Sequence, residues 1–184
     1  MNRLISFFVL IALLAGAGLT LADTPGYVMR YADVNDTWIV FSYEDDLWLV
    51  PVKGGDARRI TSHQGRELYA KFSPDGSKLA FNANYDGGRD VYVMDVMGGV
   101  PERLTFHPSG GTVLGWTPDG ASVVFASNRY APVYAAELYT VPVTGGAAVK
   151  LAVDRGSLAS FSPDGNAMAF NRFGRHTRTW KRYE

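Results

Sequence analysis

Short runs of alternating apolar and polar residues make up most of the sequence beyond residue 22. Leu79, Phe81 and Ala83 fall on one side of an extended chain, and the run DVYVMDV (90–96) alternates in the same way. The second side of these runs is also partly apolar, which indicates sheets that are packed on both faces. Beyond residue 22, no segment carries an apolar stripe of helical period over a helical length. The pattern predicts an all-β protein.

The strands are predicted to belong to a repeat of 44 to 45 residues. The sequence FSPDG (72–76) returns as WTPDG (116–120) and again as FSPDG (161–165). The first unit (31–61) fits the same frame with DVND in place of the PDG sequence. Double glycines also recur, at residues 54–55, 98–99 and 145–146. Each unit divides into four short strands, which in the second unit are expected at about 68–73, 78–83, 90–96 and 100–105.

A repeat of about 44 residues with four strands is the signature of a β-propeller blade. The predicted fold class is therefore an all-β, incomplete β-propeller with three full four-stranded, WD40-like blades and the inner half of a fourth. The blades are expected at about 28–61, 68–105, 112–152 and 157–184, the last one incomplete. Because propellers close with about four to eight blades, we expect a fragment of a longer polypeptide that cannot close a ring and whose uncovered faces self-associate or aggregate.

The repeated PDG sequence has the chemistry of a tight turn between the innermost and the second strand of a blade. Pro74 fixes φ at the second turn position, Asp75 can bond its own backbone, and Gly76 accepts a positive φ. The double glycines supply left-handed residues to a later hairpin in the same way. Asp75, Asp119 and Asp164 also permit a metal or catalytic interpretation, but their recurrence in every unit favours turn chemistry.

The first 22 residues read as a secretory signal peptide. A short positive start precedes the apolar run LISFFVLIALLA (4–15), and Thr20 and Ala22 hold the −3 and −1 places of a cleavage site. Cleavage after Ala22 would leave residues 23–184 as an exported, periplasmic chain that is not bound to a membrane. The alternative is an uncleaved anchor, for which the apolar run is short, since a span needs about 20 residues.

Cysteine content and charge narrow the function classes. The sequence has no cysteine, which excludes disulfides, thiol catalysis and a lipoprotein anchor. Residues 23–171 carry 12 basic and 17 acidic residues, which argues against a nucleic-acid-binding surface. Five basic residues stand in the segment 172–184, where a solvated loop is favoured over an interaction arm.

Three polar residues occupy equivalent places after the fourth strands. His63, His107 and Asp154 follow the sequences ITS, LTF and LAV, so pseudo-symmetry would set them on one face. Two histidines and an aspartate are suitable metal ligands, but neighbouring blades would hold them far apart, and a loop consensus explains their recurrence. We therefore assign no catalytic, cofactor-binding or metal-binding residue and expect no cofactor.

Other candidate residues have simpler explanations. No G-x-S-x-G elbow occurs, and the serines of HPSGG (107–111) and GSLAS (156–160) are not paired with a base. The acidic run YEDD (43–46) is expected in a solvated hairpin. The tryptophans are expected in the core rather than in a set that stacks on a ligand: Trp38, Trp48, Trp116 and Trp180.

The repeats resemble the WD40-like repeats of periplasmic propellers. The order SPDG, GG, LT is shared by tricorn-type serine proteases, by the translocation propeller of the Tol system and by propellers of prolyl oligopeptidase-like enzymes. The sequence most resembles the first propeller of tricorn protease homologues, in residues 25–63, 71–108 and FNRFGRHTRTWKRY (170–183). A Tol protein is expected to place a mixed α/β domain first, and no space for one precedes the repeats.

The resemblance implies a large exported peptidase, with a second propeller, a PDZ-like domain and serine-dependent catalytic domains C-terminal to this segment. No catalytic residue of that family falls on a position of this chain. The expected role is a non-catalytic propeller segment that gates or guides peptide substrates or scaffolds the assembly. Its expected partners are peptides or proteins, the remaining blades and catalytic domains of the parent chain, and further copies in a homo-oligomer. The alternative is a cell-envelope, protein-binding propeller of the Tol type without enzymatic activity.

Overall fold

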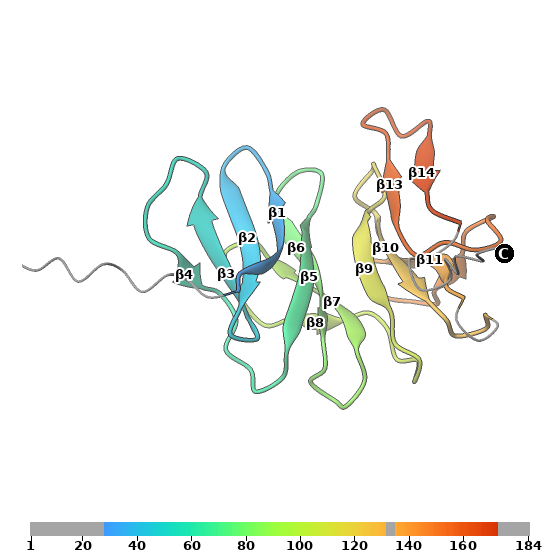
Figure 1. Ribbon diagram of the computed structural model, residues 1–184, viewed down its shortest axis with the longest axis horizontal. Helices are drawn as coiled ribbons and strands as arrows, with labels where there is room; N and C mark the ends of the chain where they lie inside the picture. Colours follow the sequence, from blue (N-terminus) through green and yellow to red (C-terminus); the bar gives the residue numbers. More distant parts are fainter. Residues whose placement is uncertain (1–27, 132–134, 173–184) are drawn as a thin grey trace, which may run out of the picture.

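The computed structural model describes residues 28–131 and 135–172, which form a row of antiparallel β-sheets (Figure 1). Fourteen strands and no helix occur in this part of the chain, so the predicted all-β class is confirmed. No helix in the described ranges is long and apolar enough to cross a membrane.

Each sheet is formed by strands that are consecutive in the chain. The first sheet contains β1 (Arg30–Val34), β2 (Trp38–Tyr43), β3 (Asp46–Pro51) and β4 (Arg58–Arg59). The second sheet contains β5 (Glu67–Phe72), β6 (Lys78–Ala83), β7 (Asp90–Asp95) and β8 (Glu102–Arg103). The third sheet contains β9 (Thr112–Trp116), β10 (Ser122–Ser127), β11 (Glu137–Pro142) and β12 (Val149–Lys150). The fourth sheet has two strands, β13 (Ala159–Phe161) and β14 (Met168–Phe170).

The first strands of consecutive sheets lie next to one another. β1 contacts β5, β5 contacts β9, and β9 contacts β13. The turns that follow these strands, and the β3–β4 hairpin, lie along the upper edge in Figure 1, whereas the β2–β3 and β6–β7 connections lie at the lower edge. The sheets therefore stand like propeller blades with their first strands innermost, as the repeat predicts.

Both faces of the second sheet are buried. Leu79, Phe81, Tyr92 and Met94 pack against the first sheet, in a core that includes Val40. On the opposite face, a second core joins the sheet to the third one, with these buried residues: Ala80, Val91, Val93, Leu104, Val113, Trp116, Val123, Phe125, Tyr139 and Val141. The alternation predicted for residues 78–96 is thus confirmed, and each side of the alternation serves a different interface.

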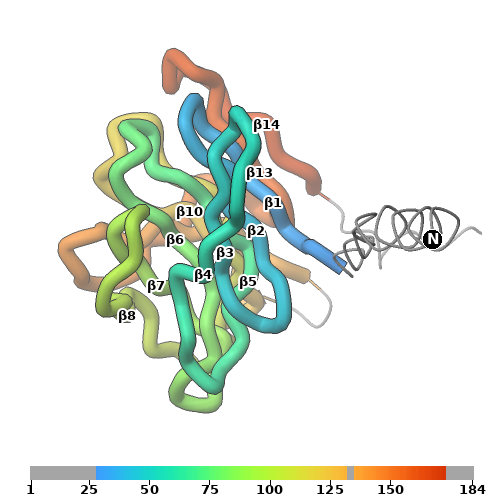
Figure 2. Tube along the Cα trace, turned by 90° about the vertical axis from the view of Figure 1, so that its left-hand side faces the viewer, coloured from blue at the N-terminus to red at the C-terminus, as the bar shows by residue number. Residues whose placement is uncertain are grey.

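The outer face of the first sheet has no sheet against it in the described part of the chain. Figure 2 looks onto this face, with β1 to β4 in order across it. Large apolar side chains are exposed on and around the sheet, among them Val34 (62% exposed) and Val52 (45%). The described sheets do not close into a ring, which agrees with the predicted incomplete propeller.

Two sequence predictions lie outside the described residues. The signal peptide (1–22) is one of them, and most of the run at 170–183, with Trp180, is the other. Of the other tryptophans, Trp116 is buried and Trp38 packs against the first core, as predicted. Trp48 is half-buried and stacks edge-on against Tyr43.

Candidate functional site

The PDG aspartates are held by the turns in which they lie. Asp75 Oδ1 accepts hydrogen bonds from the Ser73 hydroxyl at 2.6 Å and from the Ser77 N–H at 3.0 Å. These bonds lower the pKa of Asp75 to about 2. Asp119 and Asp164 are held by equivalent bonds within their own turns. The three aspartates therefore act as turn residues, as the recurrence indicates.

The glycine of each PDG turn adopts the positive φ that the turn requires, and it also lies close to the preceding turn. Gly76, Gly120 and Gly165 have φ values of 72°, 69° and 73°. A Cβ atom at Gly120 would lie 3.7 Å from Pro74, and one at Gly165 would lie 3.2 Å from Pro118. The second and third PDG turns therefore rest against the proline of the turn before, whereas a Cβ at Gly76 would lie 3.0 Å from the Asn35 side chain of the DVND turn. This stacking holds successive blades at one end of the sheets.

A pocket of about 240 Å³ lies where the three PDG turns meet. Gly115 opens it, since no heavy atom lies within 4 Å of the position that a Cβ would take there. At the corresponding place between the first two sheets, Lys71 and Asp33 form an ion pair at 2.9 Å. The pocket is lined mainly by the turn prolines and by β9 and β13, and includes Pro74, Pro118, Pro163, Leu114, Trp116 and Phe161.

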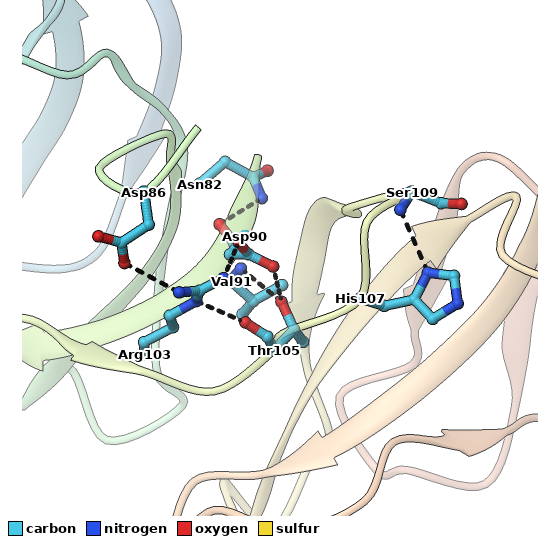
Figure 3. Close-up of polar contacts among 8 residues, drawn as sticks. All are labelled: Asn82, Asp86, Asp90, Val91, Arg103, Thr105, His107 and Ser109. Atoms are coloured by element: carbon cyan, nitrogen blue, oxygen red, sulfur yellow. Dashed lines mark hydrogen bonds and ion pairs between the residues drawn. The ribbon is translucent and has the colours of Figure 1, made fainter. Parts of the chain in front are cut away.

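The structure does not bring His63, His107 and Asp154 together. His63 accepts the Gly65 N–H at Nδ1, 3.0 Å away, and His107 accepts the Ser109 N–H at 3.2 Å (Figure 3). Asp154 pairs with Arg172 at 3.3 Å. Within residues 28–131 and 135–172, no group of three His, Cys, Asp or Glu side chains could hold a metal ion. The histidines cap their own loops instead.

The second sheet contains a buried acid–base cluster that the sequence pattern did not predict (Figure 3). Asp90 opens β7 and its side chain is only 2% exposed. Its carboxylate accepts from Arg103 at 2.7 Å and from the Thr105 hydroxyl at 2.9 Å, and Arg103 also pairs with Asp86 at 2.8 Å. The Thr105 hydroxyl in turn accepts the Val91 N–H at 3.0 Å. The cluster ties β7 to β8.

The same ion pair recurs in the neighbouring sheets. Asp46 pairs with Arg59 at 3.3 Å in the first sheet, and Glu137 pairs with Lys150 at 2.5 Å in the third. In each sheet the acid opens the third strand and the base follows it 13 residues later, at the end of the fourth. That constant spacing was the sequence signal for the pairs. Their recurrence assigns them to blade construction.

The comparisons with known proteins agree with this geometry. Residues 26–184 match the family described as the tricorn protease N-terminal beta propeller domain. Tricorn protease homolog 1 of Streptomyces coelicolor is 34% identical over 74 residues, which are 40% of this chain and 7% of that protein. The chain thus matches only a small part of this relative's length.

Solved structures share the arrangement of the sheets. The crystal structure of the tricorn protease superposes with a TM-score of 0.64 and 27% identity, over 74% of this chain and 14% of that chain. TolB from Acinetobacter baumannii has a TM-score of 0.64 at 23% identity, over 80% of this chain and 39% of that chain. The likeness to TolB shows the fold alone. Because the family match spans all the described sheets, the chain belongs to the tricorn protease N-terminal beta-propeller family.

Proposed function

We propose that this chain is a non-catalytic propeller segment of an exported, tricorn-like serine peptidase, where it guides or gates peptides or scaffolds the assembly. The observation that carries the proposal is the family match over residues 26–184, which includes every described sheet. The match is to a propeller domain, and serine-dependent cleavage would come from other parts of a longer protein. The signal peptide predicted for residues 1–22 supports export.

The pocket formed by the turn prolines supports contact with peptides. It lies between the first strands β9 and β13, which are on the inner side of the arc of sheets. Trp116 and Phe161 give it apolar walls, and Ser160 and Ser162 are among its polar lining residues. A small apolar side chain of a passing peptide fits a site of this size and lining.

The test is to isolate the protein from its source cells with an antibody against residues 23–184. We expect a band several times larger than this chain, and hydrolysis of fluorogenic peptides that a serine-directed inhibitor abolishes. The matched control is the purified chain of residues 1–184, which we expect to cleave none of these peptides.

Two outcomes would contradict the proposal. An isolated protein that hydrolyses no peptide and carries only further blades would favour the alternative, a protein-binding propeller of the cell envelope without enzymatic activity. Peptidase activity of the purified chain, lost on substitution of one of its own serines, would place catalysis inside the segment.

A further inference from the structure

Glu67 lies at the joint between the first and second sheets. It opens β5, and its side chain has no exposed surface. The Glu67 N–H donates to the Asp45 carbonyl oxygen at 2.7 Å. The Thr61 hydroxyl donates to Glu67 Oε2 at 3.0 Å and accepts the Leu47 N–H at 2.7 Å. A carboxyl group of the second sheet is thereby fixed against the backbone of the first.

A second carboxyl group faces Glu67 from the first sheet. Asp46 opens β3 directly after Asp45, whose carbonyl oxygen accepts the Glu67 N–H. The Asp46 carboxyl group and the Tyr85 hydroxyl are both near enough to influence the pKa of Glu67. Arg59 pairs with Asp46 at 3.3 Å, and the His63 ring packs at a tilt against Tyr85 with 4.0 Å between ring centroids. The positive charge at the joint therefore neutralises Asp46 rather than Glu67.

The nearby Arg66 is paired with a different group. Its Nε lies 2.8 Å from Asp45 Oδ1, and both side chains are more than half exposed. This pair sits at the surface beside the joint, so Arg66 does not balance a charge on Glu67.

Three buried oxygen atoms at this end of the first two sheets have no hydrogen-bond partner among the described residues. They are Ser42 Oγ, Asp46 Oδ1 and Glu67 Oε1. A buried acceptor without a donor costs free energy. A proton on one of the two carboxyl groups would let that group donate to the other, so that a single O–H···O bond would give both Asp46 and Glu67 a partner.

The next joint along the chain has no such acid. Gly111 donates its N–H to the Arg89 carbonyl oxygen at 3.0 Å, as Glu67 does to Asp45, so Gly111 holds the place of Glu67. A Cβ atom at Gly111 would lie 2.6 Å from Phe125. The joint between the second and third sheets therefore has no room for a carboxyl group at this position.

A neutral amide joins the second and third sheets instead. Asn82 donates to the Gly111 carbonyl oxygen at 3.0 Å and accepts the Val113 N–H at 2.8 Å. In the first sheet Ser42 takes the place of Asn82, as the pairing of β2 with β3 and of β6 with β7 shows. The Ser42 side chain is shorter than that of Asn82 and carries a hydroxyl in place of the amide group. Of these two joints, only the first depends on an ionisable group at this place.

We propose that the first and second sheets are joined by a proton shared between Glu67 and Asp46, so that the joint weakens as the pH rises. The proton bridges β5 to β3, which belong to different sheets. Loss of the proton would leave negative charges on both Glu67 and Asp46, and Arg59 pairs only with Asp46. The proposal concerns this joint and does not depend on the peptidase assignment.

The direction of the pH effect follows from the environment of Glu67. Burial raises the pKa of Glu67 to about 7, with the Asp46 charge adding to the effect and hydrogen bonds from Tyr85 and Thr61 opposing it. The folded chain then binds the proton at pH values where the unfolded chain has released it. Stability is greatest below the ordinary glutamate pKa and falls as the pH rises toward 7. Above that value this group adds no further change.

Infrared spectroscopy of the purified full chain tests the shared proton directly. We expect a C=O stretching band of a protonated carboxylic acid that disappears with a midpoint near the raised pKa of Glu67. The Glu67→Gln variant should lose this band. The matched control Glu137→Gln removes an acid that is paired with Lys150 in another sheet, and should keep it.

Denaturant unfolding tests the consequence for stability. Between about pH 5 and pH 8 we expect the unfolding equilibrium constant of the parent chain to rise about 100-fold, and that of Glu67→Gln to lose most of this rise. Asp46→Asn offers a second variant if Glu67→Gln does not fold. Its amide would donate to an ionised Glu67, so the infrared midpoint should move to lower pH.

The proposal is overturned if the parent chain shows no titrating carboxylic-acid band near neutrality. It is equally overturned if the band survives in Glu67→Gln, or if the midpoint is unchanged in Asp46→Asn.

Discussion

Glycine is used in two distinct ways at single positions of this chain. At Gly120 the backbone has φ of 69° and turns back against Pro74 of the preceding turn. At Gly115 the missing side chain opens the pocket between β9 and β13, and nothing lies within 4 Å of where a Cβ would be. The first glycine is required by conformation, whereas the second leaves space.

These two roles predict different results for the same substitution. Gly120→Ala should destabilise the fold by about 1 kcal/mol, because an L side chain is strained at positive φ. Gly115→Ala is the matched control and should change the unfolding free energy by less than about 0.5 kcal/mol, since it meets no atom. Denaturant midpoints at equal chain concentration measure both changes. Equal losses in the two variants would show that the turn conformation is not the cause.

In each of the first three sheets, an ion pair connects the third strand to the fourth. The acid opens the third strand and the base ends the fourth. In the second sheet this tie is the most buried, since Asp90 bonds both Arg103 and Thr105 beneath the surface. β8 is only two residues long, so few backbone hydrogen bonds hold it to β7. The ion pair therefore carries much of the attachment of the outermost strand.

Removing the buried ion pair should lower the unfolding free energy far more than removing an exposed ion pair of the same sheet. Asp90→Ala leaves Arg103 without its buried partner and should destabilise the fold by about 3 kcal/mol. Asp95→Ala removes an exposed pair with Lys78, whose side chains are 73% and 45% exposed, and should cost less than about 1 kcal/mol. Thermal or denaturant unfolding compares the two. A loss below that of Asp95→Ala would mean that the buried cluster does not stabilise the blade.

The described sheets form an open arc, and one face of the first sheet has no other described sheet against it. The outer side of the first sheet has no described sheet against it, and Val34 and Val52 are exposed there. If such a face bares roughly 400 Å² of apolar surface, covering it is worth on the order of 10 kcal/mol. This is comparable with the stability of an entire domain, about 5–15 kcal/mol.

The purified chain should therefore self-associate through its uncovered faces. Sedimentation velocity over a range of concentrations should show species larger than the monomer, and their share should fall on dilution. A sharp monomer at all concentrations, with one cooperative melting transition, would contradict this prediction.

Short-range chemistry in the sequence determined the repeat, the strand positions and the turn type. The PDG turns and the alternation around Leu79 and Phe81 depend on residues a few positions apart, so they can be recognised without knowing the fold. They identified the propeller and its incomplete fourth blade. His63 and His107, aligned by the same repeat, proved to cap their own loops, since equivalent places in successive blades are not thereby close together.

Only the tertiary structure decided which acidic side chains are buried and which groups lie next to them. Glu67 reads as an ordinary surface glutamate, and Asp90 as one acid among 18 in the chain. Both are buried in the folded chain, and Asp46, which influences Glu67, lies in another blade 21 residues away in the sequence. Burial and cross-sheet neighbours set the charge state of such a group, and both arise only when the sheets stack.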